Sequence, residues 1–316
     1  MKQQRPLSGR LFPGRKDQEN DLGFGTKVGA SGERLIDKNG RFNVQRSGRR
    51  QWLIYEPLIE MPWALFLLLV VAFYFAINGV FAFLLALLGP GALIGVDETE
   101  FWTRFVKSFF FSIQTFTTVG YGAMSPHSIA ANLIAVMDAM VGLIAVALVT
   151  GLVFSRFSRP KAHILFSKNA LIAPYKDGKS LQFRIVNERS NKIINLETQV
   201  VFSWTEYRNG EATRRYVGLK LEREKVTLFP LNWTLVHEIG SDSPFHNQTP
   251  ERLQQMNAEI LVIVQGFDET FSQTVHANYS YMANEILWDY RFNKMYYPED
   301  GVVRLELDKL NDVSKV

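Results

Sequence analysis

Five consecutive residues between two long apolar stretches carry the chemistry of this sequence: Thr118, Val119, Gly120, Tyr121 and Gly122. Backbone carbonyls and a threonine hydroxyl are oxygen ligands that can replace the water shell of a dehydrated cation when four such segments surround one axis. Gly120 and Gly122 permit backbone conformations that most side chains forbid, so successive carbonyls can point the same way. The pattern therefore predicts the lining of a cation pore.

This string is the known filter sequence of potassium channels, so the assignment of K⁺ to it is a recognition of the motif. We expect K⁺ to bind at Thr118, Val119, Gly120 and Tyr121. Taken alone, the same five letters also suit a strand that ends in a turn of a soluble protein. The context favours the pore, because residues 104–116 are typical of a helix that enters a membrane part-way. Non-helical backbone at membrane depth needs protein or water around it, and a filter has both.

Two apolar segments hold that loop in a membrane. Residues 62–88 carry no charge and would be about 40 Å long as a helix, enough to cross a hydrocarbon core of about 30 Å. Residues 129–157 form the second predicted span, which has Arg156 at its end and is followed by Arg159. Basic flanks and an acidic connecting loop predict that both termini are cytoplasmic, according to the positive-inside rule.

One charged residue, Asp138, interrupts the second span. Acids inside a membrane normally face water or a partner, so Asp138 is a candidate functional residue. Counting in fours from it places Gly142, Val146, Thr150 and Phe154 on one helical face. If this face lines the pore, Asp138, Val146 and Thr150 border the cavity. Four rings of Phe154 would then form a gate that closes by dewetting, and packing of this ring against lipid or a helix is the alternative.

The rest of the chain has a different pattern on each side of the pore. The first 50 residues contain twelve Lys and Arg against five Asp and Glu, and we expect a basic tail that is mobile in isolation. Residues 51–61 are amphipathic and predict a helix in the membrane interface, with an extended linker as the alternative. The predicted domains are therefore a basic tail (1–50), an amphipathic slide helix (51–61), a pore domain (62–158) with outer helix 62–88, pore helix 104–116, filter 118–122 and inner helix 129–157, and a cytoplasmic β-sandwich (159–316).

The β-sandwich prediction depends on period-two alternation after His163. Residues 196–204 alternate cleanly and residues 259–264 form an apolar strand, while Asp177-Gly178 and Asn209-Gly210 are hairpin signals. Short strands with this turn punctuation predict an antiparallel, immunoglobulin-like all-β sandwich. The chain has no cysteine, no phosphate loop and no nucleophile elbow. We therefore expect no enzyme activity, no cofactor besides permeant K⁺ ions and no nucleic-acid partner, and the sequence leaves any soluble ligand open.

Beyond the filter, the chain resembles the inward-rectifier potassium channels, and most closely their bacterial branch. The resemblance covers roughly residues 52–292, and its most specific strings are Leu165 to Ala170, Val236 to Ile239 and Ala283 to Trp288. It implies a homotetramer in a bacterial plasma membrane, with a cytoplasmic regulatory domain and a gate at Phe154.

The resemblance also implies contacts with anionic lipid headgroups at Arg156, Arg159 and Lys161. As an alternative, these three residues only set the topology.

Several positions depart from the eukaryotic members of that family. Gln114 and Met124 stand where those members have a Glu–Arg pair behind the filter. Val146 replaces the acidic residue of strong rectifiers, and Gln265 replaces an acidic vestibule residue. Block by polyamines or Mg²⁺ is therefore not expected from these positions, although Asp138 could partly substitute. Two other functions stay open: a poorly selective cation channel, and a membrane-anchored binding module.

Overall fold

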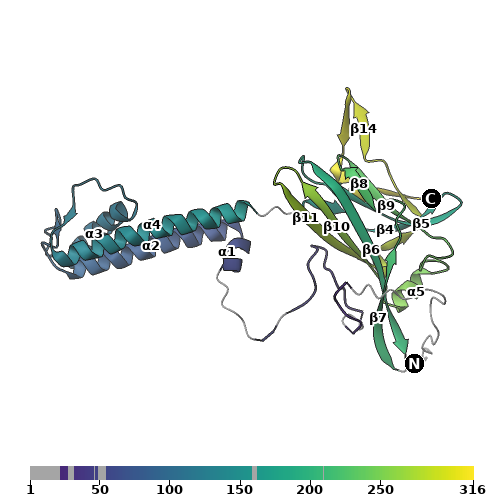
Figure 1. Ribbon diagram of the computed structural model, residues 1–316, viewed down its shortest axis with the longest axis horizontal. Helices are drawn as coiled ribbons and strands as arrows, with labels where there is room; N and C mark the ends of the chain where they lie inside the picture. The colour runs from purple at the N-terminus through teal and green to yellow at the C-terminus, as the bar shows by residue number, and fades with distance from the viewer. Residues whose placement is uncertain (1–21, 28–31, 46, 49–54, 159–161, 209) are drawn as a thin grey trace. The chain divides into compact units, whose positions relative to one another are not determined.

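The computed structural model describes residues 22–27, 32–45, 47–48, 55–158, 162–208 and 210–316. Figure 1 shows a helical part and a part built on β-sheets. The chain divides into two compact units, one of residues 48–159 and one that combines residues 1–47 with residues 160–316. The predicted combination of membrane helices with a C-terminal all-β domain is confirmed at this level.

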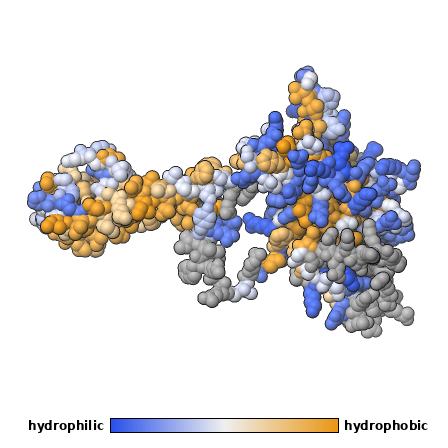
Figure 2. All heavy atoms as spheres, viewed as in Figure 1, coloured by the Kyte–Doolittle hydropathy of each residue, from blue (hydrophilic) through white to orange (hydrophobic). Residues whose placement is uncertain are grey.

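The helical unit contains α1 (Tyr55–Glu60), α2 (Trp63–Leu87), α3 (Phe101–Phe116) and α4 (Ile129–Phe157). Helices α2 and α4 are long and apolar enough to cross a membrane, and only 17% of the most apolar window of each is buried. A core helix of a soluble protein would be mostly buried, so these faces need another apolar environment. Figure 2 shows hydrophobic atoms along much of this unit. Helix α3 begins at Phe101, slightly before the predicted start.

A compact connection holds α3 between the two long helices. The short strands β1 (Leu93–Ile94) and β2 (Ser125–Pro126) pair antiparallel, which ties the segment before α3 to the segment after the filter. The side chain of Ser128 caps α4 by accepting a hydrogen bond from the Ala131 amide at 3.1 Å. Leu85, Phe111 and Ala135 belong to the small apolar core that these elements enclose.

The β-unit is a sandwich of two five-stranded sheets. The first sheet is antiparallel throughout and consists of β6 (Ile193–Arg208), β7 (Glu211–Leu219), β8 (Lys225–Leu228), β10 (Glu259–Asp268) and β11 (Gln273–Met282). The second contains β3 (Ile164–Phe166), β4 (Ala170–Tyr175), β5 (Gly178–Asn187), β9 (Asn232–Glu238) and β12 (Ile286–Trp288). Buried side chains of both sheets, such as Phe183 and Val262, form the main core.

Two details of the sandwich differ from the prediction. Strand β12 pairs with β4 in parallel, so the second sheet is mixed and the prediction of a wholly antiparallel sandwich is wrong there. A parallel pair needs a long crossover between its strands, which local alternation cannot reveal. The turn between β4 and β5 also lies one residue earlier than predicted, at Lys176 and Asp177. Lys176 takes a positive φ of 51° there.

Smaller elements complete the β-unit. Helix α5 (Pro250–Gln255) inserts Leu253 into the main core. The C-terminal part forms β13 (Tyr290–Phe292) paired with β16 (Val313–Lys315), the hairpin of β14 (Tyr296–Glu299) and β15 (Val302–Leu305), and the 3₁₀ turns η1 (Ala283–Glu285) and η2 (Leu307–Asn311).

The described part of the N-terminal region packs on the first sheet, a contact that the composition of the tail does not reveal. Leu35 and Ile36 are buried with Val201, Tyr216 and Leu261. The Leu35 amide donates to Glu259, whose carboxylate also pairs with Arg214 at 3.1 Å, both side chains being fully buried. Burial raises the pKa of Glu259 and lowers that of Arg214. Overall charge does not reveal these few apolar anchors, because their apolar partners lie 165 (201 − 36) to 226 (261 − 35) residues away in the sequence.

Candidate ion-conducting site

The filter segment follows α3 directly and has an unusual backbone. Thr118, Gly120 and Gly122 have positive φ angles of 60°, 52° and 80°. Positive φ is rare for a residue with a side chain, so the conformation of Thr118 must be imposed by its surroundings. Residues with positive φ therefore alternate with Val119 and Tyr121, which do not have it. Two of the three positive-φ positions are glycines, as expected for a backbone that side chains disfavour.

Hydrogen bonds anchor the filter segment to the end of α3. The amides of Thr118 and Val119 donate to the carbonyls of Thr115 and Gln114 at 3.0 and 2.9 Å, and the Gly120 amide also donates to Gln114. Among the described residues, no group donates to the carbonyl oxygens of 118–121. Backbone carbonyls are strong acceptors that need a partner. The amides of 118–120 are therefore bonded to the end of α3, whereas the carbonyls of 118–121 accept no hydrogen bond from the described residues.

Two close backbone contacts hold the segments on either side of the filter in place. Gly95 has a positive φ of 84°, and a Cβ placed on it would lie 2.7 Å from the carbonyl oxygen of Ala123. A Cβ on Gly142 of α4 would lie 2.3 Å from the carbonyl oxygen of Phe116, the last residue of α3. Both glycines thus allow backbone to approach backbone around the filter.

Arg104 secures the opposite end of α3. Its Nε donates to the Ala86 carbonyl at 2.8 Å, and its Nη1 donates to the carbonyls of Glu98 and Thr99. The last carbonyls of a helix have no partner within the helix, and a buried guanidinium satisfies one of them at the end of α2. Sequence reasoning missed this role. The available signal was an Arg in the first turn of a helix that also contains Lys107 and is otherwise rich in aromatic residues.

The structure encloses Asp138, in contrast to the cavity position expected for it. Its side chain has no exposed surface even in a single subunit. The four-residue periodicity placed Asp138 and Gly142 on the same face of α4 as Val146 and Phe154, but α3 covers the part of that face that contains Asp138 and Gly142. Sequence reasoning also missed Asn78 and Ser112, which are equally enclosed. Polar residues in apolar helices were the only signal for them.

The later part of the same face is uncovered within the subunit. Val146 is 57% exposed and Phe154 is 71% exposed, and Thr150 is also exposed. Packing against another helix was the alternative to a gate at Phe154, and the described residues of one subunit do not provide such packing. This face is available to a cavity, a neighbouring subunit or lipid.

Arg156 is engaged by α1 and by two aromatic rings. Its Nη1 and Nη2 donate to the carbonyls of Leu58 and Met61 at the end of α1. Its guanidinium carbon lies 4.6 Å from the ring centroids of both Trp63 and Phe66, a cation–π geometry.

The Tyr55 hydroxyl also lies 2.7 Å from the Ser155 hydroxyl. The described part of the expected slide segment is thus a short helix attached to α4. Residues 51–54, Arg159 and Lys161 lie outside the described residues.

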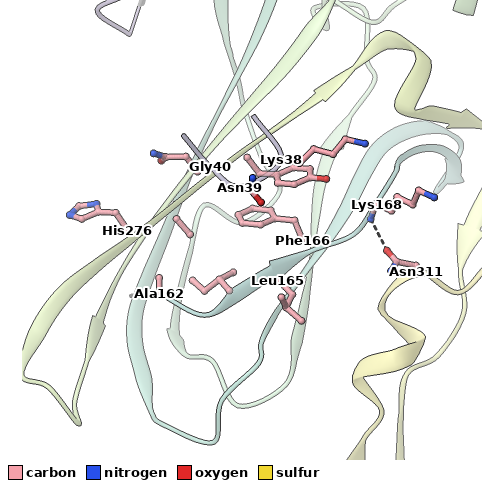
Figure 3. Close-up of a pocket in the computed structure, with 13 residues that line it drawn as sticks. Lys38, Asn39, Gly40, Ala162, Leu165, Phe166, Lys168, His276 and Asn311 are labelled. Carbon is pink, nitrogen blue, oxygen red and sulfur yellow. Dashed lines mark hydrogen bonds between the residues drawn. The ribbon is translucent and has the colours of Figure 1, made fainter. Parts of the chain in front are cut away.

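The β-unit contains a pocket of about 700 Å³ between the N-terminal segment and β3. Figure 3 labels Lys38, Asn39, Phe166 and Lys168 among the residues that line it, with Lys168 next to Asn311. The Lys168 amide donates to the Asn311 side chain at 2.6 Å. The described residues contain no cluster of potential metal ligands. A mixed lining of apolar, amide and ammonium groups does not select one class of soluble ligand.

Comparisons with known proteins place both units in one family. Residues 69–159 match the ion channel model, and residues 164–316 match the model of the inward rectifier potassium channel C-terminal domain. The chain is 33% identical over 297 residues to inward rectifier potassium channel Kirbac3.1 of Paramagnetospirillum magnetotacticum, covering 92% of this chain and 99% of that protein. It is 29% identical over 313 residues to G protein-activated inward rectifier potassium channel 3 of mouse and of human, covering 90% of this chain and 78% of each.

These similarities extend across the filter, both membrane helices and the β-sandwich. The relatives are ion channels and not enzymes, in agreement with the sequence prediction. The unused carbonyls of 118–121 and the two apolar helices are features that a membrane ion channel requires. The chain belongs to the inward rectifier family of potassium channels.

Proposed function

We propose that four copies of this chain surround one K⁺-selective pore. The main observation behind this proposal is the backbone of segment 118–122. The amides of 118–120 donate to the end of α3, while the carbonyls of 118–121 receive no hydrogen bond from the described residues. Four such segments around an axis would supply rings of oxygen atoms that replace the water shell of K⁺. The described residues of one subunit supply a single such segment, so the proposed site is incomplete without the other copies.

The exposed face of α4 supports a cavity and a gate below that filter. Val146 and Thr150 would border the cavity, whereas Asp138 is enclosed and takes no part in it. The exposed ring of Phe154 would meet its three symmetry copies and close the pathway by excluding water.

The contacts of Arg156 support a specific form of lipid control. A guanidinium that already bonds two carbonyls of α1 and stacks on Trp63 has little freedom to follow a mobile headgroup. We therefore assign Arg156 to the coupling of α1 with the gate helix α4. Arg159 and Lys161 remain the proposed residues for anionic headgroups, which attract basic residues beside a membrane.

Flanking charges support an orientation with both termini in the cytoplasm and the filter toward the outside. The similarity to the bacterial channel Kirbac3.1 supports a bacterial plasma membrane as its location. K⁺ then crosses the plasma membrane passively, down its electrochemical gradient. The position of the β-unit after α4 supports its role as a cytoplasmic regulatory domain.

Tracer uptake tests this function. Full-length protein in liposomes should take up ⁸⁶Rb⁺, with block by Ba²⁺, little competition by Na⁺, and a rate that changes with the content of anionic lipid. Phe154→Ala should raise uptake several-fold by removing the constriction. Leu148→Ala, a matched change of another exposed apolar residue of α4, should not. Strong Na⁺ competition would instead indicate a poorly selective cation channel.

A membrane-anchored binding module is the remaining alternative. If this alternative is right, liposomes that contain the Phe154→Ala variant should show no Ba²⁺-sensitive ⁸⁶Rb⁺ uptake in any lipid mixture. The mass of the detergent-solubilised complex separates the two functions independently, since the channel requires four copies.

A further inference from the structure

Three polar side chains from three helices are enclosed together in the apolar pore unit. Asn78 of α2, Ser112 of α3 and Asp138 of α4 have no exposed surface. Ser112 lies six residues before Thr118, and Asp138 lies one helical turn before the Gly142 contact with Phe116. Because Asp138 is covered within one subunit, neither cavity water nor a neighbouring subunit reaches it unless α3 and α4 move apart.

The hydrogen bonds of Asn78 have a fixed direction. Its Nδ2 donates to the Tyr74 carbonyl at 2.8 Å, and a carbonyl can only accept. Its Oδ1 must therefore be the atom that meets Ser112, whose hydroxyl donates to it at 2.9 Å. A serine hydroxyl has one proton, so the Ser112 oxygen has only lone pairs left for another neighbour.

Asp138 is that neighbour, and it has no cationic partner. Ser112 interacts with its carboxyl group, yet neither carboxyl oxygen receives a properly formed hydrogen bond within the described residues. The titratable group that faces it from α2 is the Tyr74 phenol, and no Lys, Arg or His of the described residues interacts with it.

An unpaired buried carboxylate costs several kcal/mol. A neutral carboxyl avoids most of that cost. Its hydroxyl can donate a hydrogen bond to the lone pairs of the Ser112 oxygen, whereas an ionised carboxylate has no proton and would be repelled by them.

We propose that Asp138 is a proton-binding site whose neutral carboxyl completes a one-way hydrogen-bond chain, from Asp138 to Ser112 to Asn78 to the Tyr74 carbonyl. The chain joins α4, α3 and α2 next to the point where α4 touches the end of α3. Asp138 is therefore a positioning residue for the filter and not a cavity residue. Loss of the proton would place a charge in the apolar contact and separate α4 from α3.

Infrared spectroscopy of the full-length protein in lipid vesicles tests the proton directly, whether or not the protein conducts K⁺. At neutral pH the wild type should show the C=O stretch of a protonated carboxyl that Asp138→Asn lacks. Glu98→Gln is the matched control, because Glu98 lies outside the spanning helices, pairs with Lys107 and has a lowered pKa. That control should keep the band. Loss of a carboxylate band in Asp138→Asn, with no change in the protonated band, would overturn the proposal.

A second variant tests the chain itself and does not require Asp138→Asn to fold. Ser112→Ala removes the acceptor, so the protonated carboxyl band should move to higher frequency. An unmoved band would show that Asp138 does not donate to Ser112.

Thermal melting of the assembled protein adds a readout of positioning. Asp138→Asn keeps a donor for Ser112 and should melt above Asp138→Val, which has none. Equal melting of these two variants would contradict the proposed chain.

Discussion

Gly142 lies directly against the carbonyl oxygen of Phe116, at the point where α4 crosses the end of α3. A Cβ on Gly142 would lie 2.3 Å from that oxygen, whereas a Cβ on Gly151, nine residues later in α4, would have no neighbour within 4 Å. Phe116 is separated from Thr118 by one residue, so α4 touches the backbone next to the filter. Any displacement of α4 at Gly142 therefore acts on the filter.

Replacement of Gly142 by Ala should disturb this contact. The atom in the way is a backbone oxygen with no freedom to rotate, so α3 and α4 must separate, at a cost of about 1–3 kcal/mol. We expect a lower melting temperature of the assembled protein and weaker Rb⁺ uptake. Gly151→Ala is the control, and it should be neutral or stabilising by up to about 1 kcal/mol. Equal behaviour of the two variants would refute the role of the contact.

Substitution of Arg104 by Lys should destabilise the pore unit despite the retained charge. Arg104 donates to three carbonyls from one planar group, and an ammonium cannot reproduce that geometry. Loss of one or two bonds to a charged donor should cost about 2–5 kcal/mol. Melting of the protein in lipid nanodiscs measures the effect. Lys107→Arg, at the more exposed neighbouring cation, should change it little.

Arg156→Lys separates the coupling role of this residue from lipid binding. Lysine keeps the positive charge that a headgroup needs but loses the paired donation to Leu58 and Met61 and the stacking on Trp63. If Arg156 couples α1 to α4, Arg156→Lys should alter Rb⁺ uptake at every lipid composition. Neutralising Arg159 and Lys161 should instead remove only the dependence on anionic lipid. A normal Arg156→Lys channel would return Arg156 to the lipid-binding set.

Glu285 should attach the N-terminal segment in a pH-dependent manner. Burial acts to raise its pKa, but hydrogen bonds from Lys38, the Met282 amide and Arg34 outweigh it and hold the pKa below the ordinary 4.5. Because the ionised form is the one stabilised, this contribution is present above the ordinary pKa and is lost as the pH falls through the lowered value.

Glu285→Gln should therefore weaken hydrogen-exchange protection of the Leu35 amide at pH 7 by about 1–3 kcal/mol, and have little effect in strong acid. The control is Glu299→Gln, whose ion pair with Arg304 is largely exposed and should contribute little. Equal loss of protection at both pH values would contradict the assigned role of the charge.

Local sequence determined the parts of this protein that depend on neighbours along the chain. The charge-free run of 62–88 needs a membrane because it has no polar side to turn toward water. The alternation of 196–204 requires a strand with one buried face. The filter letters are informative because only glycine readily allows the backbone that Gly120 and Gly122 adopt.

Tertiary structure alone decided which long-range neighbours each residue meets. Periodicity placed Asp138 and Phe154 on the same face of α4. Packing of α3 covers Asp138 but leaves Phe154 exposed. The same holds for Arg156: the family resemblance implied a lipid contact, and the tertiary structure places its guanidinium against α1 and Trp63. A side chain's type and period define its face on a helix, whereas its partner depends on contacts between segments distant in the sequence.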